Sequence, residues 1–228
     1  MPRLIAILML LLSACGSVNY NALPEGRFDG ALFVMWVGEG SAQAGDGKFV
    51  YVPMPNDPLT FTRSAQDATL RVIRPQIMYT DGGSIPRVAQ PFRGLSPWGY
   101  APGYVVHDWL FLARNCVAAG IANPEEARVA DMPFQESAEV LGEAIKTLIA
   151  ENRVAPDDVA PNAISGAVAG PISRSLWGRK GGCPEPRISP EHMAQVERAL
   201  GRLTAQEEGR RIRPPDGPVA GIVSIVQF

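Results

Sequence analysis

The sequence lacks an excess of either charge, with 21 basic residues against 23 acidic ones and a formal net charge of -2. Domains that bind nucleic acid normally carry a large positive excess, so this balance argues against such a partner. Histidine and cysteine are scarce, with two and three residues, which argues against a zinc site built from Cys and His clusters. Proline and glycine are abundant, at 21 and 23 residues, and this favours a loop-rich globular fold of short elements.

The N-terminus carries an apolar run of nine residues, 4–12, preceded by Arg3. A membrane-spanning helix needs about 20 residues, so the run has the length of a signal peptide core instead. The small residues Ser13 and Ala14 precede Cys15, which is the pattern of a lipoprotein signal whose cysteine accepts a diacylglycerol. The alternative is an ordinary cleaved signal that contains a cysteine by chance.

The lipoprotein interpretation predicts where the protein resides and what anchors it. Residues 1–15 would be the signal, and the lipid on Cys15 would hold the protein on the periplasmic face of the cell envelope. No Asp follows the cysteine to retain the protein in the inner membrane, because position 16 is glycine. We therefore expect the outer membrane, with the membrane itself as the first partner.

Two cysteines remain once Cys15 is assigned to lipid. The envelope is an oxidising compartment, so Cys116 and Cys183 are candidates for a disulfide. Such a bond would close a loop of more than 60 residues and stabilise the fold by roughly 3–4 kcal/mol in the chain-entropy model. The alternative is two separate buried thiols.

The first half of the chain reads as β structure. A polar tether is expected at 16–27, and residues 38–47 contain four glycines and read as a loop. Alternating apolar and β-branched residues predict strands at 28–37, 48–54, 59–63 and 68–79. Together they predict a small antiparallel sheet in the N-terminal part.

The second half reads as helical. Residues 103–119 are apolar nearly all round and end at Gly120, which predicts a buried helix. A second core helix is expected at 123–152, where Pro133 should kink or end it. Further helices are expected at 160–175 and 189–208, followed by a Pro-rich linker and a last strand within 210–228. The fold class predicted is therefore α+β, with one domain at 28–209 that has two core helices.

One side of the buried helix carries polar groups. Buried ionisable groups are costly unless they are paired, so a partner, ligand or metal should face them. Asp131, on the apolar stripe of the second core helix, is expected to orient the His107 ring, as a carboxylate does for a general base. The alternative is a purely structural network. The residues predicted along this side are Tyr104, His107, Asp108, Phe111 and Asn115.

A cation site is the second expectation at this helix. Asp108 would be free to bind a hard cation, and Asp81 in a Gly-rich turn would add an oxygen ligand, which suits Ca²⁺. Alternatively, Asp81 and Ser84 simply cap a turn. His192, near the start of a polar helix, is expected to be a solvated bystander.

Four motifs occur in one order along the chain, as T-D-G-G-S-I-P-R from Thr80, W-G-Y from Trp98, H-D-W-L-F from His107 and A-D-M-P-F from Ala130. They resemble a phage and bacterial family known as domain of unknown function 1353. The resemblance covers about residues 28–150 and leaves the C-terminal third outside it. It implies a common fold and no particular activity.

The His107-Asp108 helix, with Asp131 ahead, is also similar to the helical core of the secreted phospholipase A-two superfamily. That resemblance implies that His107 is the base that activates water, that Asp108 binds Ca²⁺ and that Asp131 orients the histidine. It argues for a kind of site more than for a function.

Three functions follow from these observations. The first is a membrane-anchored hydrolase of an ester, lipid-like substrate, with an open cleft over His107 and a cation requirement. The second is a non-enzymatic scaffold or binding lipoprotein, in which His107 and Asp131 are buried behind Trp98, Tyr104 or Trp109. The third is an accessory role at the cell wall or in a phage context.

Overall fold

The computed structural model describes residues 18–38, 48–83, 96, 98–156, 160–207 and 221–228. It has two antiparallel sheets and a set of helices, so the α+β prediction is confirmed. The signal at 1–15 with Cys15, the loop at 39–47, the motif residues from Ser84 to Arg87 and the linker at 210–218 lie outside the described residues. In the described part of the chain, no helix is both long and apolar enough to cross a membrane.

The larger sheet has the strand order β6-β3-β2-β7, and the smaller sheet has the order β1-β4-β5. All the pairings between these strands are antiparallel. In the larger sheet the strands are β2 (Ala31–Gly38), β3 (Lys48–Tyr51), β6 (Met78–Thr80) and β7 (Gly221–Gln227). In the smaller sheet they are β1 (Arg27–Asp29), β4 (Thr60–Thr62) and β5 (Val72–Ile73).

Strand β2 is buried on both faces, which explains why it is almost continuously apolar. Alternate side chains of a strand point to opposite faces of its sheet. Leu32 and Val34 accordingly join the main core, whereas Phe33 and Met35 join a second core on the other face. The larger sheet is therefore the middle layer of the molecule, with helices on each side.

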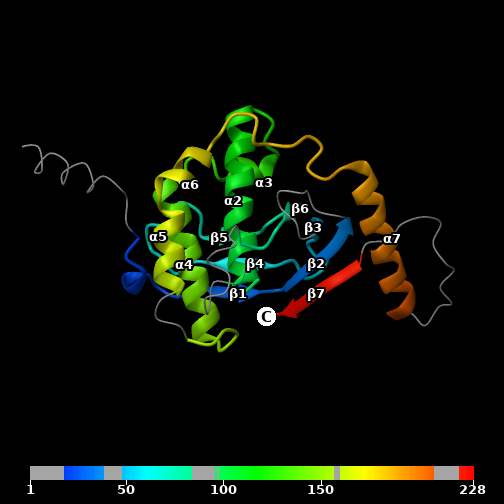
Figure 1. Ribbon diagram of the computed structural model, residues 1–228, viewed down its shortest axis with the longest axis horizontal. Helices are drawn as coiled ribbons and strands as arrows, with labels where there is room; N and C mark the ends of the chain where they lie inside the picture. Colours follow the sequence, from blue (N-terminus) through cyan, green and yellow to red (C-terminus); the bar gives the residue numbers. More distant parts are fainter. Residues whose placement is uncertain (1–17, 39–47, 84–95, 97, 157–159, 208–220) are drawn as a thin grey trace, which may run out of the picture.

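Helices α2 (Ala101–Ala119) and α4 (Phe134–Ala150) pack together against the main core. Helix α7 (Pro190–Glu207) covers the opposite face of the larger sheet, as Figure 1 shows at the right of the molecule. The remaining elements are η1 (Tyr20–Ala22), α3 (Pro124–Ala127), α5 (Ala160–Val168) and α6 (Pro171–Leu176). The two core helices expected from the sequence are thus α2 and α4.

Four predicted segments are divided in the structure. The strand expected at 28–37 forms β1 and β2, which belong to different sheets. Residues 68–79 form the separate strands β5 and β6, and 160–175 form the helices α5 and α6. The helix expected at 123–152 stops after α3 and resumes at α4, with turns at 128–131 between them. Pro133 is the N-cap of α4 with an extended ψ of 149°, so it separates two helices instead of kinking one.

The expected tether is wrong for its described part, residues 18–27, because this segment packs on α4. The ammonium of Lys146 donates to the carbonyl of Leu23 at 2.6 Å, and the Gly26 amide donates to Thr147 Oγ1 at 2.7 Å. Gly142 leaves the space that the Leu23 side chain occupies. The N-terminal segment is therefore part of the domain.

The last strand expected from the sequence adds to the larger sheet, so the domain extends beyond residue 209. Strand β7 pairs with β2, with Leu32 opposite Val226. The ring of Phe228 lies 5.1 Å from the ring of Phe28, in the main core. Strand β1 and the C-terminal residue thus meet in the main core.

Candidate functional site

The polar residues His107 and Asp108 lie on α2, as expected, in a helix whose first half is almost entirely buried. The helix begins at Ala101, with Pro102 in its first turn, where a missing amide costs no hydrogen bond. It ends at Gly120, which has a left-handed φ of 74°. His107 and Asp108 occupy the middle of this helix, and Tyr104 lies one turn before them.

His107 is nearly closed off from solvent. Its side chain is 9% exposed, and its Nε2 is buried without a hydrogen-bond partner in the described structure. Its ring centroid lies 4.8 Å from that of Phe111, whose ring in turn lies 4.9 Å from that of Trp177. An aromatic group thus covers one side of the imidazole, and the residues that the structure describes leave the His107 ring largely closed off.

Asp108 is the group of the pair that reaches solvent, with 34% of its side chain exposed. Its Oδ1 lies 3.7 Å from Nδ1 of His107, which is longer than a hydrogen bond but close enough for the charges to interact. Desolvation raises the pKa of the Asp108 carboxyl above its ordinary value, the His107 ring offsets part of that effect, and the charge of Asp81 adds to it.

The charge of Asp81 thus acts on the Asp108 carboxyl. The turn that carries Asp81 follows β6, and Gly82 donates its amide to Thr80 Oγ1 at 3.1 Å. A Cβ placed on Gly83 would lie 2.8 Å from the Tyr104 ring, so this turn packs closely on α2. Burial and the charge of Asp108 both raise the pKa of the Tyr104 hydroxyl.

Asp131 does not meet His107, and this part of the predicted site is wrong. Its side chain is exposed, in the turn between α3 and α4. The guanidinium of Arg114 binds the carbonyl of Ala130 and holds this turn beside α2. Arg114 is seven residues beyond His107, or roughly 10 Å along the helix. The break before Pro133 thus removes Asp131 from the apolar stripe on which it was expected.

The predicted calcium site falls short of a complete site. Ca²⁺ takes six to eight oxygen ligands. Among the residues that the structure describes, no three His, Cys, Asp or Glu side chains gather closely enough to hold a metal ion. Asp81 and Asp108 alone do not fit this requirement, so no chemical step below uses a metal.

Of the three aromatic residues expected to cover His107, two lie in the main core and one lies at its edge. Trp109 and Tyr104 are buried, at 0% and 3% exposure, and belong to the main core. Trp98 is partly buried against the Phe49 ring, with centroids 5.2 Å apart. Asn115, predicted on the polar side of α2, accepts a hydrogen bond from the Arg179 amide at 2.7 Å and thereby binds the chain after α6.

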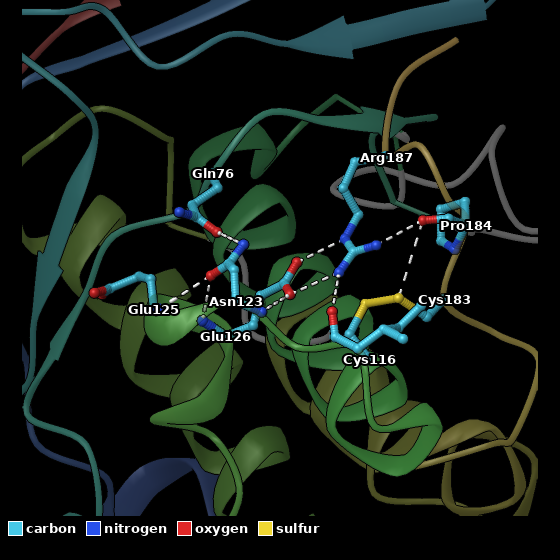
Figure 2. A network of polar contacts seen from close by, with 9 residues as sticks. Gln76, Cys116, Asn123, Glu125, Glu126, Cys183, Pro184 and Arg187 are labelled. Atoms are coloured by element: carbon cyan, nitrogen blue, oxygen red, sulfur yellow. Dashed lines mark hydrogen bonds and ion pairs between the residues drawn. A yellow bond between two sulfur atoms is a disulfide. The ribbon is translucent and has the colours of Figure 1, made fainter.

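The expected disulfide joins Cys116 to Cys183 and fixes the chain after α6 to the end of α2. Beside it lies a polar network that the sequence did not reveal, shown in Figure 2. Arg187 donates to both carboxylate oxygens of Glu126 at 2.8 Å, and Glu126 completes a capping box with Asn123. Because Glu126 is 1% exposed and fully paired, this network stabilises the fold and offers no free group for catalysis.

His192 is not the solvated bystander that the sequence predicted. Its Nδ1 lies 2.8 Å from the Tyr79 hydroxyl, which also accepts a hydrogen bond from the Ser189 amide at 3.0 Å. The contact joins the start of α7 to strand β6. The sequence around Tyr79 predicts only a strand. Its contact with His192, more than 100 positions away, could not be predicted from local sequence patterns.

Comparisons of the chain with protein-family models, with curated proteins and with solved structures gave no match. The likeness to the family of unknown function and to the phospholipase core stays a prediction.

Proposed function

We propose that this chain is a lipid-anchored envelope protein that hydrolyses an ester substrate at Asp108, with His107 as the buried partner of that carboxylate. The observation that supports it most is the pairing of a one-third exposed Asp108 with a buried imidazole 3.7 Å away. Both lie on an otherwise apolar helix, where an ionisable pair is costly to bury.

The roles differ from those implied by the phospholipase resemblance. There the histidine is the base, but here its ring is closed off and the carboxylate faces solvent. Burial raises the pKa of the Asp108 carboxyl, which makes it a stronger base than an ordinary aspartate. Asp108 accepts a proton from water as that water attacks the ester carbonyl. It then returns the proton to the alkoxide that leaves when the C–O bond breaks.

The lipid on Cys15 would keep this site beside a membrane substrate, which supports a lipid-like ester. Cys15 lies outside the described residues, so the anchor rests on the lipoprotein signal alone. A divalent cation near Asp81 and Asp108 is part of the proposal only as a modulator, because these two carboxylates do not make a full set of ligands.

The test measures hydrolysis of short and long chromogenic esters by the full chain and by three variants. Asp108→Asn should lower kcat/KM at least 100-fold, since general acid–base groups contribute about 10²–10⁴-fold. His107→Asn should lower it less, because His107 acts through Asp108. Asp131→Asn is the matched control, because it removes an exposed carboxylate of the same kind, and it should leave the rate unchanged.

Each assay is run with Ca²⁺ and with a chelator. A rate that falls in the chelator and falls further in Asp81→Asn would support a cation near this turn. An enzyme whose rate is the same in Asp108→Asn as in the wild type would overturn the assignment of the site.

The second candidate is a non-enzymatic envelope lipoprotein with a structural His-Asp pair. The 9% exposure of the His107 side chain and the aromatic cover of Phe111 favour it. In that case no ester is hydrolysed, and His107→Asn lowers the stability of the fold without any change in activity. Thermal unfolding of the same variants separates the two functions.

A further inference from the structure

Helix α6 holds large apolar side chains in solvent. Ile172 is 76% exposed and Leu176 is 39% exposed, and the two lie one turn apart on the same face of the helix. Among the described residues, the other large apolar side chains exposed to this degree are Trp36 and Ile121. An apolar pair held in water at one place is the kind of feature that marks an interaction site.

Helix α6 and the turn after it, residues 171–184, carry only positive charges. They contain three exposed basic residues, Arg174, Arg179 and Lys180, and no acidic one, while Glu185 follows the turn. The Arg174 guanidinium lies over the Phe134 ring, 4.6 Å from its centroid. Arg179 and Lys180 follow the helix and extend the positive charge beside Leu176. The neighbouring face of α5 is exposed and uncharged.

The framework beneath α6 is fixed. Trp177, directly after the helix, packs on Phe111 and Phe134 with ring centroids 4.9 and 6.3 Å apart. The Arg179 amide is bound to Asn115, and the chain is fixed again at the disulfide of Cys183. Ile172 and Leu176 are thus held outward by a packed segment, whereas Trp177 beside them is turned inward.

We propose that the α6 surface, defined as Ile172, Leu176, Arg179 and Lys180, docks on an anionic phospholipid bilayer. Apolar side chains enter the boundary between headgroups and acyl chains, while Lys and Arg beside them attract anionic lipids. The surface has both features, and a short helix with two apolar residues needs no shape-matched partner to bury them. Because its charged residues, Arg179 and Lys180, are both positive, the surface favours an anionic bilayer over a zwitterionic one.

This docking would place the candidate site next to lipid. Trp177 connects α6 to Phe111, and the Phe111 ring lies against His107. The inference does not depend on hydrolysis, because the bilayer contact uses α6 and the chemistry uses α2. Vesicle docking in a protein without esterase activity would leave the inference standing and overturn the proposed function alone.

The test uses the full chain with Cys15→Ser, reconstituted in vesicles and labelled at one new cysteine with an environment-sensitive fluorophore. Ser175→Cys lies on α6 beside Leu176, and Glu197→Cys on the exposed face of α7 is the matched control. The first label should shift to the blue and be quenched by nitroxide lipids in vesicles with 30% anionic lipid, on the order of a typical anionic leaflet. The control label should do neither.

Two variants then separate the contributions. Ile172→Asp with Leu176→Asp should remove the blue shift at position 175. Arg179→Glu with Lys180→Glu should remove the difference between anionic and zwitterionic vesicles. Equal signals at positions 175 and 197, or a signal at 175 that neither variant changes, would overturn the proposal. So would a blue shift at 175 in the absence of vesicles, which would indicate a second copy of the chain as the occupant.

Discussion

The guanidinium of Arg63 and the carboxylate of Glu143 face each other as two parallel forks, with Nε donating to Oε2 at 2.9 Å and Nη2 to Oε1 at 2.7 Å. Arg63 is 2% exposed and Glu143 is 1% exposed. Arg63 also binds Glu136, whose Oε1 accepts the Thr69 amide at 2.7 Å. The pair joins the end of β4 to α4, which otherwise meet through apolar side chains.

Removing the cation from this network should cost much of the stability of the fold. Arg63→Met leaves two buried carboxylates without their positive partner, which costs about 3–5 kcal/mol when a buried pair is broken. Arg71→Met, an exposed arginine close by, is the control and should change the free energy of unfolding by less than about 0.5 kcal/mol. Urea unfolding monitored by circular dichroism measures both. A loss equal to that of the control would contradict the prediction.

The disulfide should be a main source of stability. Cys116 and Cys183 are 67 positions apart, and in the chain-entropy model such a closure stabilises by about 4 kcal/mol. The double variant Cys116→Ala/Cys183→Ala should lose about that amount in thermal or urea unfolding, and the wild type in a reducing buffer should approach the same value. A double variant that unfolds at the wild-type midpoint would show that the bond does not constrain the unfolded chain.

Asp108 should destabilise the folded state as pH rises. Its pKa is raised on folding, so its contribution to stability is present below the ordinary value of 3.8 and is lost as pH rises through the raised pKa. Asp108→Asn keeps the protonated form of the side chain at every pH. At neutral pH it should therefore unfold at a higher urea concentration than the wild type, with the difference disappearing near pH 3.8. Asp131→Asn, on an exposed turn, should show no such dependence.

The contact between Tyr79 and His192 should couple α7 to the larger sheet. Tyr79→Phe removes the hydroxyl that accepts the Ser189 amide and faces His192, which should cost about 1–2 kcal/mol. Combining it with His192→Ala should cost less than the sum of the two single variants by about 0.5 kcal/mol or more. Strictly additive free energies of unfolding would show that the two side chains do not stabilise each other.

Much of the fold followed from the sequence because it depends on local patterns. The start and end of α2, the predicted disulfide and the last strand came from periodicity, Gly120 and the cysteine count. The two-sided burial of β2 could not be read, because a continuous apolar run does not reveal which sheet or helix covers each face. The residues in Arg63–Glu143 are 80 positions apart, so no local signal links them.

The candidate site was predicted in part. The His107-Asp108 pair and the nearby Asp81 turn were identified because charged residues on an apolar helix need partners. The prediction for Asp131 is wrong because it required one continuous helix over 123–152. Pro133 instead begins a new helix, so Asp131 lies in the turn before it and not on the apolar stripe. The sequence predicted a helix at 160–175 but gave no sign that Ile172 and Leu176 would be exposed.

The pairing of β2 with β7 has a consequence for how the sheet is assembled. Leu32 is opposite Val226, so one edge of β2 is left open until nearly the whole described chain has been made. In the interval β2 offers a row of unpaired backbone groups flanked by apolar side chains, which is the arrangement that invites pairing with other chains. A chaperone that covers β2 until β7 arrives would shorten that exposure.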